Sequence, residues 1–180
     1  MGIPRGAGDG VEHASGVPQP NADGVRPVAT SVSLQAVRPR SLAVVRREVR
    51  PGEVGSAWGP ALGLVWPFIR SQTGLWSGGH NVFVYHQASE AGAPLVCEFG
   101  VEVTRPFETT GEVYATTTPA GDAAVAVHRG SYDRLNDAYV AIERWMAANR
   151  RESAGVSWEI YGDPTPNPAD TETTVVQLLK

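Results

Sequence analysis

The order in which helical and β-type segments follow one another most restricts the fold of this sequence, because the order occurs twice. The first copy places its strand, helix, strand and strand at residues 41–49, 56–70, 81–86 and 94–103. The second copy places them at residues 122–128, after residue 131, at 156–161 and at 173–179. Helices separated by pairs of strands predict an α+β fold, with an antiparallel sheet that carries two helices on one side. We therefore expect a duplicated strand-helix-strand-strand repeat with a central ligand groove between its halves.

Both helices are predicted from apolar residues at helical spacing. In the first helix, Pro67 must kink or end the helix because proline lacks the backbone N–H group. In the second helix, Ser131 is the expected N-cap. Tyr132, Tyr139 and Met146 share the spacing of its buried face, so core packing is expected for these three side chains.

The N-terminal part of the chain has a different composition from the rest. All 14 aromatic residues lie between Trp58 and Tyr161, and residues 1–27 contain six glycines and four prolines. A segment of this kind cannot bury enough apolar surface to offset the entropy lost on ordering. We expect a disordered tail at residues 1–38 and one folded domain at residues 39–180.

Composition and charge exclude several classes of function. A net charge of −4 and a pI of about 5.5 provide no basic surface, so direct nucleic-acid binding is not expected. The longest apolar stretch, residues 61–69, is too short to span a membrane, and the N-terminus lacks an export signal, so a soluble cytoplasmic protein is expected. The histidines lack metal-ligand spacing and Cys97 stands alone among apolar neighbours. Neither a metal nor another cofactor is expected, and Cys97 should lie in the core.

Three segments of the second half carry a resemblance to a known family. They are PAGDAAVAVHRGSYDRLNDAYVAIERW at residues 119–145, SWEIYGDP at residues 157–164 and the Thr-rich last strand. With its H-x-G-x-Y-x-x-L helix start and its E-x-Y-x-D-P strand, this half resembles the GyrI-like small-molecule-binding domain, also called the AraC-type effector-binding domain. The resemblance implies a pseudo-twofold fold of two repeats around an aromatic-lined pocket for amphipathic, often cationic molecules.

Glu159 is the residue on which the functional interpretation depends. By strand alternation Ser157, Glu159 and Tyr161 share one face. A charged residue at such a position is most often a surface charge facing solvent. Alternatively, the face borders the pocket, where the carboxylate would attract a cation among aromatic rings. The resemblance favours the pocket, because the glutamate that serves as the family's cation partner falls at Glu159.

The resemblance leaves three functions open. The first is stand-alone binding of hydrophobic, aromatic, often cationic small molecules. The second is hydrolysis of cyclopropane-containing DNA-alkylating natural products, in which Glu159 would activate water as a general base and Tyr161 would assist by hydrogen bonding. The third is inhibition of a larger target, as in gyrase-inhibitor proteins.

Two tryptophans and one histidine complete the set of candidate residues. Trp66 and Trp145 hold matching positions at the ends of the two helices and are expected at the groove edges, where they would stack on a planar ligand. Ordinary packing of both side chains fits the same positions. His128 precedes the turn at Gly130, and we expect it to be a structural histidine that hydrogen-bonds this turn.

Overall fold

The structure, a computed structural model, describes residues 30–50, 52–88, 90 and 93–180. Its elements in chain order are β1 (Val32–Val37), β2 (Ser41–Val49), α1 (Val54–Ser71), β3 (Asn81–His86), β4 (Leu95–Glu102), β5 (Tyr114–Thr117), β6 (Gly121–Arg129), the 3-10 turn η1 (Tyr132–Arg134), α2 (Asn136–Asn149), β7 (Ser153–Tyr161), the 3-10 turn η2 (Pro168–Asp170) and β8 (Glu172–Leu179). The predicted repeat is confirmed as β2-α1-β3-β4 followed by β6-α2-β7-β8, and β1 and β5 are additions to it.

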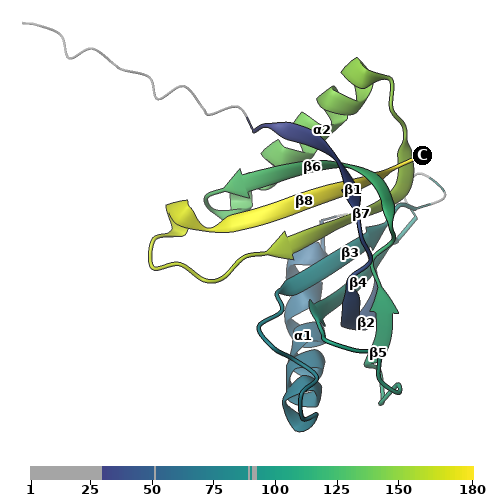
Figure 1. Ribbon diagram of the computed structural model, residues 1–180, viewed down its shortest axis with the longest axis vertical. Helices are drawn as coiled ribbons and strands as arrows, with labels where there is room; N and C mark the ends of the chain where they lie inside the picture. The colour runs from purple at the N-terminus through teal and green to yellow at the C-terminus, as the bar shows by residue number, and fades with distance from the viewer. Residues whose placement is uncertain (1–29, 51, 89, 91–92) are drawn as a thin grey trace, which may run out of the picture.

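The eight strands found in the described residues form one sheet in the order β1-β6-β8-β7-β3-β4-β2-β5. Every pairing is antiparallel, so the α+β class with an antiparallel sheet and two helices is confirmed. In Figure 1 both helices lie on the same side of the sheet, with α1 over the β3-β4-β2 half and α2 over the β6-β8 half. No helix in the described part of the chain is long and apolar enough to cross a membrane.

The register of the central strands shows what lies between the two helices. Phe83 in β3 pairs with Glu159 in β7, and Glu159 pairs with Val175 in β8. Phe83 belongs to the apolar cluster under α1, and Val175 belongs to the cluster under α2. Paired residues share a face of a sheet, so Glu159 faces the helix side at the boundary between the halves.

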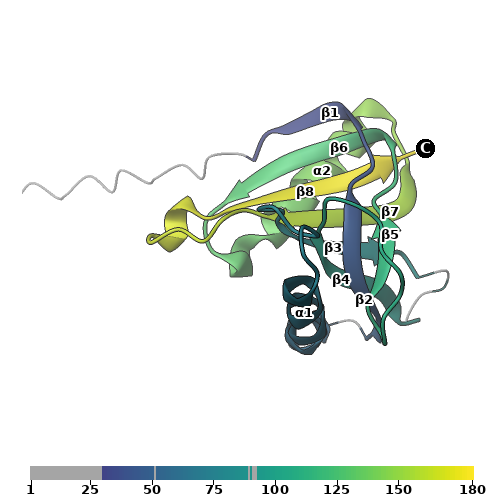
Figure 2. The same cartoon turned by 60° about the horizontal axis from the view of Figure 1, so that its bottom comes forward.

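The opposite face of the sheet is buried although neither helix of the described residues covers it. Its apolar cluster joins Leu42 and Val44 of β2 to Val125 of β6 and Trp158 of β7, although β2 and β6 lie far apart in the strand order. Only a strongly curled sheet brings these strands together, and Figure 2 shows β2 running at a steep angle to β6 and β8. The curl therefore supplies a second core and leaves the helix side for the groove.

The predicted tail ends earlier than residue 38. Residues 32–37 form β1, which pairs with β6 from Val32 opposite Ala126 to Val37 opposite Gly121. The sequence concealed this strand because β1 is an edge strand whose four central side chains are exposed, so it has no buried apolar alternation. Residues 1–29, which make up the rest of the predicted tail, lie outside the described residues.

Both helices differ from the prediction at one point. Helix α1 continues through Pro67 and ends four residues later at Ser71. This last turn packs on the apolar cluster under α1 through the side chains of Trp66, Phe68 and Ile69. This packing offsets the loss of the one backbone hydrogen bond that a proline removes. The second helical segment opens with η1, for which Ser131 is the N-cap, and α2 itself starts only after Leu135.

Candidate functional site

Glu159 is a buried carboxylate bound by three tyrosine hydroxyls. Its side chain is only 5% exposed. The Tyr139 hydroxyl donates to Oε1 over 2.7 Å, the Tyr85 hydroxyl donates to Oε2 over 2.7 Å, and the Tyr161 hydroxyl donates to the same Oε2. Among the described residues no lysine, arginine or histidine forms an ion pair with Glu159. The negative charge is therefore held by O–H dipoles and is not neutralised by a cationic side chain.

The three tyrosines come from three elements that meet at the boundary of the two halves. Tyr85 lies in β3, Tyr161 follows Glu159 by two residues on the same face of β7, and Tyr139 lies in α2. Burial raises the pKa of each phenol well above its usual value of 10.0, and the nearby negative charge of Glu159 raises it further. All three hydroxyls thus keep their protons and remain donors throughout the physiological pH range.

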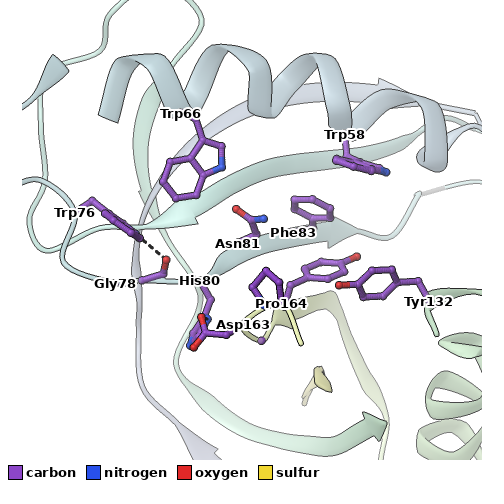
Figure 3. A pocket seen from close by; sticks show the side chains of 13 residues that line it. Trp58, Trp66, Trp76, Gly78, His80, Asn81, Phe83, Tyr132, Asp163 and Pro164 are labelled. Carbon is purple, nitrogen blue, oxygen red and sulfur yellow. Dashed lines mark hydrogen bonds and ion pairs between the residues drawn. The ribbon is translucent and has the colours of Figure 1, made fainter. Parts of the chain in front are cut away.

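A cavity of about 610 Å³ lies beside this cluster (Figure 3). Its wall consists of residues from α1, the loop after α1, the start of β3, η1 and the loop after β7. These residues are Trp58, Trp66, Trp76, Gly78, Gly79, His80, Asn81, Phe83, Tyr132, Tyr161, Gly162, Asp163 and Pro164. The volume falls within the range of roughly 300–1,000 Å³ that is typical of small-molecule sites. Tyr161 belongs both to this wall and to the cluster around Glu159.

Most of the wall is aromatic. The Phe83 and Tyr161 rings lie 4.7 Å apart between centroids, and Tyr132 meets Tyr161 edge-on at 5.5 Å. Trp66 meets Trp76 edge-on at 5.3 Å on the other side of the cavity. Tyr132 is 55% exposed and lines the same cavity. Rings in this arrangement offer stacking surface and negative π-faces to a ligand without requiring fixed hydrogen bonds.

The structure brings together three of the four predicted site residues. Glu159 does not face solvent, so the surface-charge interpretation was wrong, and Tyr161 and Trp66 border the cavity beside it. Trp145 does not border this cavity. It packs against the buried cluster of α2, β6 and β8, because α2 presents that side chain to its own half of the sheet. The predicted match between Trp66 and Trp145 therefore fails at the second helix.

Several residues of the site were missed or misassigned from the sequence. Tyr139 was assigned to core packing, and its ring does pack on the α2 cluster, but its hydroxyl reaches Glu159. Tyr132 was also assigned to the core and is exposed at the cavity. Tyr85 lies two residues after Phe83 in β3, so strand alternation places both side chains on the same face of the sheet. This spacing was the signal for Tyr85 that the sequence offered. Trp58 and Trp76 gave no comparable signal, since their positions depend on the path of α1 and the loop after it.

The remaining candidates have structural roles. A ring nitrogen of His128 lies 2.9 Å from the carbonyl oxygen of Ser131, so the predicted hydrogen bond to the turn is confirmed. Cys97 is fully buried in the core under α1, as predicted. Within the described ranges no group of three or more His, Cys, Asp or Glu side chains is arranged to hold a metal ion.

Comparisons with known proteins agree with this architecture. The family described as the GyrI-like small molecule binding domain matches residues 30–177. The EcmrR C-terminal domain is 19% identical, with a TM-score of 0.68 over 84% of this chain and 98% of that one. The structure of SAV2435 bound to tetraphenylphosphonium is 10% identical, with a TM-score of 0.62 over 83% and 94%. A hydrolase from Listeria innocua is 13% identical, with a TM-score of 0.56 over 83% and 91%. No curated protein matches the chain. At these identities the solved structures establish a shared fold.

Proposed function

The chain belongs to the family of GyrI-like small-molecule-binding domains, and from this premise we propose that it binds hydrophobic, aromatic, cationic molecules in the cavity beside Glu159. The observation that carries the proposal is the environment of that carboxylate. Three hydroxyls satisfy its hydrogen bonds, and no cationic side chain among the described residues pairs with its charge. A cation placed in the cavity supplies the missing positive charge.

The aromatic wall supports the same ligand class. Tyr161 lies between Glu159 and the cavity and contributes its ring to the wall and its hydroxyl to the carboxylate. A cation that stacks on Tyr161 is attracted by the π-face of the ring and, through a short distance of low-dielectric protein, by the negative charge behind it. A neutral ligand of the same shape gains only the stacking and the apolar burial.

The test compares ligands of one shape and different charge. Tetraphenylphosphonium is a cation, and tetraphenylborate is an anion of nearly the same shape. We expect tetraphenylphosphonium to bind and tetraphenylborate to bind far more weakly. Glu159→Gln should weaken the binding of the cation by about 1 to 3 kcal/mol, the range for hydrogen bonds and contacts that involve a charged group.

Titration calorimetry with both ions and both proteins provides the measurement. Triphenylphosphine oxide serves as a neutral control, whose affinity Glu159→Gln should leave nearly unchanged. An equal loss for the cation and the neutral compound, or no loss for either, would remove the charge of Glu159 from recognition.

We keep hydrolysis as a second candidate, since Tyr161 lines the cavity and its hydroxyl donates to the carboxylate of Glu159 behind the cavity wall. Within the described residues Oε1 accepts one hydroxyl and Oε2 accepts two, so Oε1 retains the lone pair that water activation by Glu159 requires. The discriminating measurement is mass spectrometry of a cyclopropane-containing substrate after incubation. Glu159→Gln should then reduce turnover by about 10²- to 10⁴-fold and change substrate affinity little.

A further inference from the structure

The cavity contains a buried acceptor that the protein leaves unpaired. Asn81, the first residue of β3, belongs to the cavity wall, and its side-chain oxygen is buried without a hydrogen-bond partner among the described residues. Figure 3 shows the amide of Asn81 between the Trp66 and Phe83 rings. Buried polar atoms almost always have a partner, because an unpaired one loses the hydrogen bonds that it made with water. An unpaired amide in a ligand cavity indicates a partner supplied by the ligand.

The neighbouring polar groups determine which kind of partner this is. The indole N–H of Trp76 already donates to the carbonyl oxygen of Gly79 over 2.7 Å. His80 lies 3.7 Å from Asp163, which is too long for a hydrogen bond, and the Asp163 carboxylate is 90% exposed at the cavity rim. Among the described residues, the Asn81 oxygen and the Asp163 carboxylate thus remain as acceptors without a hydrogen-bond donor at this end of the cavity. The ligand group that fits there is a hydrogen-bond donor.

The register fixes where this donor lies relative to the positive charge. Asn81 pairs with Tyr161, and Phe83 pairs with Glu159. Asn81 thus lies on the same face of the sheet as Glu159 but two residues, about 7 Å, further along the strand direction. One planar ligand of two or three fused rings spans that separation.

We infer that Asn81 is a specificity-determining residue that accepts a hydrogen bond from an N–H group on the ligand, so that the preferred ligands are planar aromatic cations bearing amino groups. This inference rests on the proposed binding of cations beside Glu159. A half turn about the last side-chain bond of Asn81 exchanges the positions of its oxygen and nitrogen, which allows the oxygen to face a bound ligand. Cations of the same shape without N–H groups leave the acceptor unpaired.

The test uses two dyes that share a ring system and a charge. Thionine and methylene blue are planar tricyclic cations; thionine carries two NH₂ groups, and methylene blue carries two N(CH₃)₂ groups in their place. The measured quantity is the Kd of methylene blue divided by the Kd of thionine, obtained by equilibrium dialysis. Differences in dye hydrophobicity cancel when this ratio is compared between variants.

Asn81→Leu removes the acceptor, and we expect it to lower the ratio by about 3- to 10-fold, the factor that corresponds to one hydrogen bond. Asn81→Asp keeps the shape and the acceptor, so the ratio should be equal to or higher than that of the unmodified chain. Thr173→Val is the matched control, because Thr173 holds the other unpaired buried oxygen among the described residues and does not line the cavity. This control should leave the ratio unchanged.

Each outcome separates the two proposals. A ratio that is the same in Asn81→Leu and the unmodified chain, with both dyes still bound, would overturn the role of Asn81 and leave cation binding intact. If the unmodified chain bound neither dye, the proposed function would fail and the role of Asn81 with it. Should Asn81→Leu fail to fold, a lower ratio in Asn81→Asp would overturn the inference by itself.

Discussion

The two oxygens of the Glu159 carboxylate are not equally supported, and this difference leads to a quantitative prediction. Within the described part of the chain Oε1 accepts one hydroxyl, from Tyr139, whereas Oε2 accepts two, from Tyr85 and Tyr161. Tyr139→Phe therefore leaves a buried carboxylate oxygen without a donor. Tyr85→Phe leaves Oε2 with its second donor in place.

The magnitudes follow from the cost of an unpaired buried charge. A hydrogen bond to a charged group contributes about 1.5 to 3 kcal/mol, and one that can be replaced contributes about 0.5 to 1.5 kcal/mol. We expect Tyr139→Phe to lower the free energy of unfolding by about 2 to 3 kcal/mol and Tyr85→Phe by about 1 kcal/mol. For a chain of this size, the loss in Tyr139→Phe corresponds to a decrease in Tm of roughly 4 to 12 °C.

Urea unfolding of both variants at pH 7 measures the two losses, and the slope of the transition checks that each variant unfolds from the same folded state. Both substitutions remove one hydroxyl and keep the ring, so the comparison isolates the hydrogen bond. A second series in Glu159→Gln should shrink the cost of Tyr139→Phe, because the uncompensated charge is gone. Equal losses for the two tyrosines in the unmodified background would refute the unequal support of the two oxygens.

Four further predictions follow from the fold and the site. Trp66→Ala should weaken cation binding by about 1 to 3 kcal/mol, and Trp145→Ala should leave it unchanged; a loss in both variants, seen by titration calorimetry, would contradict the placement of Trp145. In urea unfolding, Gly63→Ala should stabilise the protein by about 0.5 to 1 kcal/mol, because alanine favours the α1 helix and no atom lies near the added methyl group. Gly100→Ala should strongly destabilise the protein, because its methyl group would collide with the β2 backbone. Burial raises the pKa of the Cys97 thiol to about 11, and the charge of Glu159 adds to this shift. Iodoacetamide at pH 8.5 should therefore label Cys97 only after unfolding, and rapid labelling of the native protein would contradict its burial. The three tyrosines around Glu159 have a raised pKa, so above pH 10 only the unfolded chain releases their protons. The stability that they contribute is complete below pH 10 and should fall above it by up to about 4 kcal/mol per pH unit. A free energy of unfolding that stays constant between pH 10 and 11 would refute this prediction.

The features that were predictable from the sequence are those with a strong local pattern. The β7 strand and the α2 helix are apolar at regular spacing, so the repeat and the position of Glu159 within it followed from periodicity and from the family motif. The β1 strand was missed because an edge strand needs only backbone partners, and those lie in β6. Trp145 was misplaced because helical spacing fixes an angle around the helix axis but does not determine which half of the sheet the helix covers.

Two of the three tyrosines that bind Glu159, Tyr85 and Tyr139, were missed from the sequence for a different reason. Two strands and one helix that are far apart in the chain bring together Tyr85, Tyr139 and Tyr161. No local pattern distinguishes a tyrosine whose hydroxyl reaches a buried carboxylate from one that only packs its ring. Of the three, only Tyr161 was assigned to the site, because it shares a strand and a face with Glu159.

The short connection between β1 and β2 has a consequence for how the chain folds during synthesis. β1 and β2 are separated by only three residues, yet β1 pairs with β6 while β2 pairs with β4 and β5. Once the residues up to Thr117 have emerged from the ribosome, the first half can form its sheet, but β6, the partner of β1, and β7, the outer partner of β3, are still missing. Two open strand edges persist until the second half arrives, and such edges are sites of intermolecular pairing. A chain that lacks its second half therefore exposes strand edges that can pair with other chains.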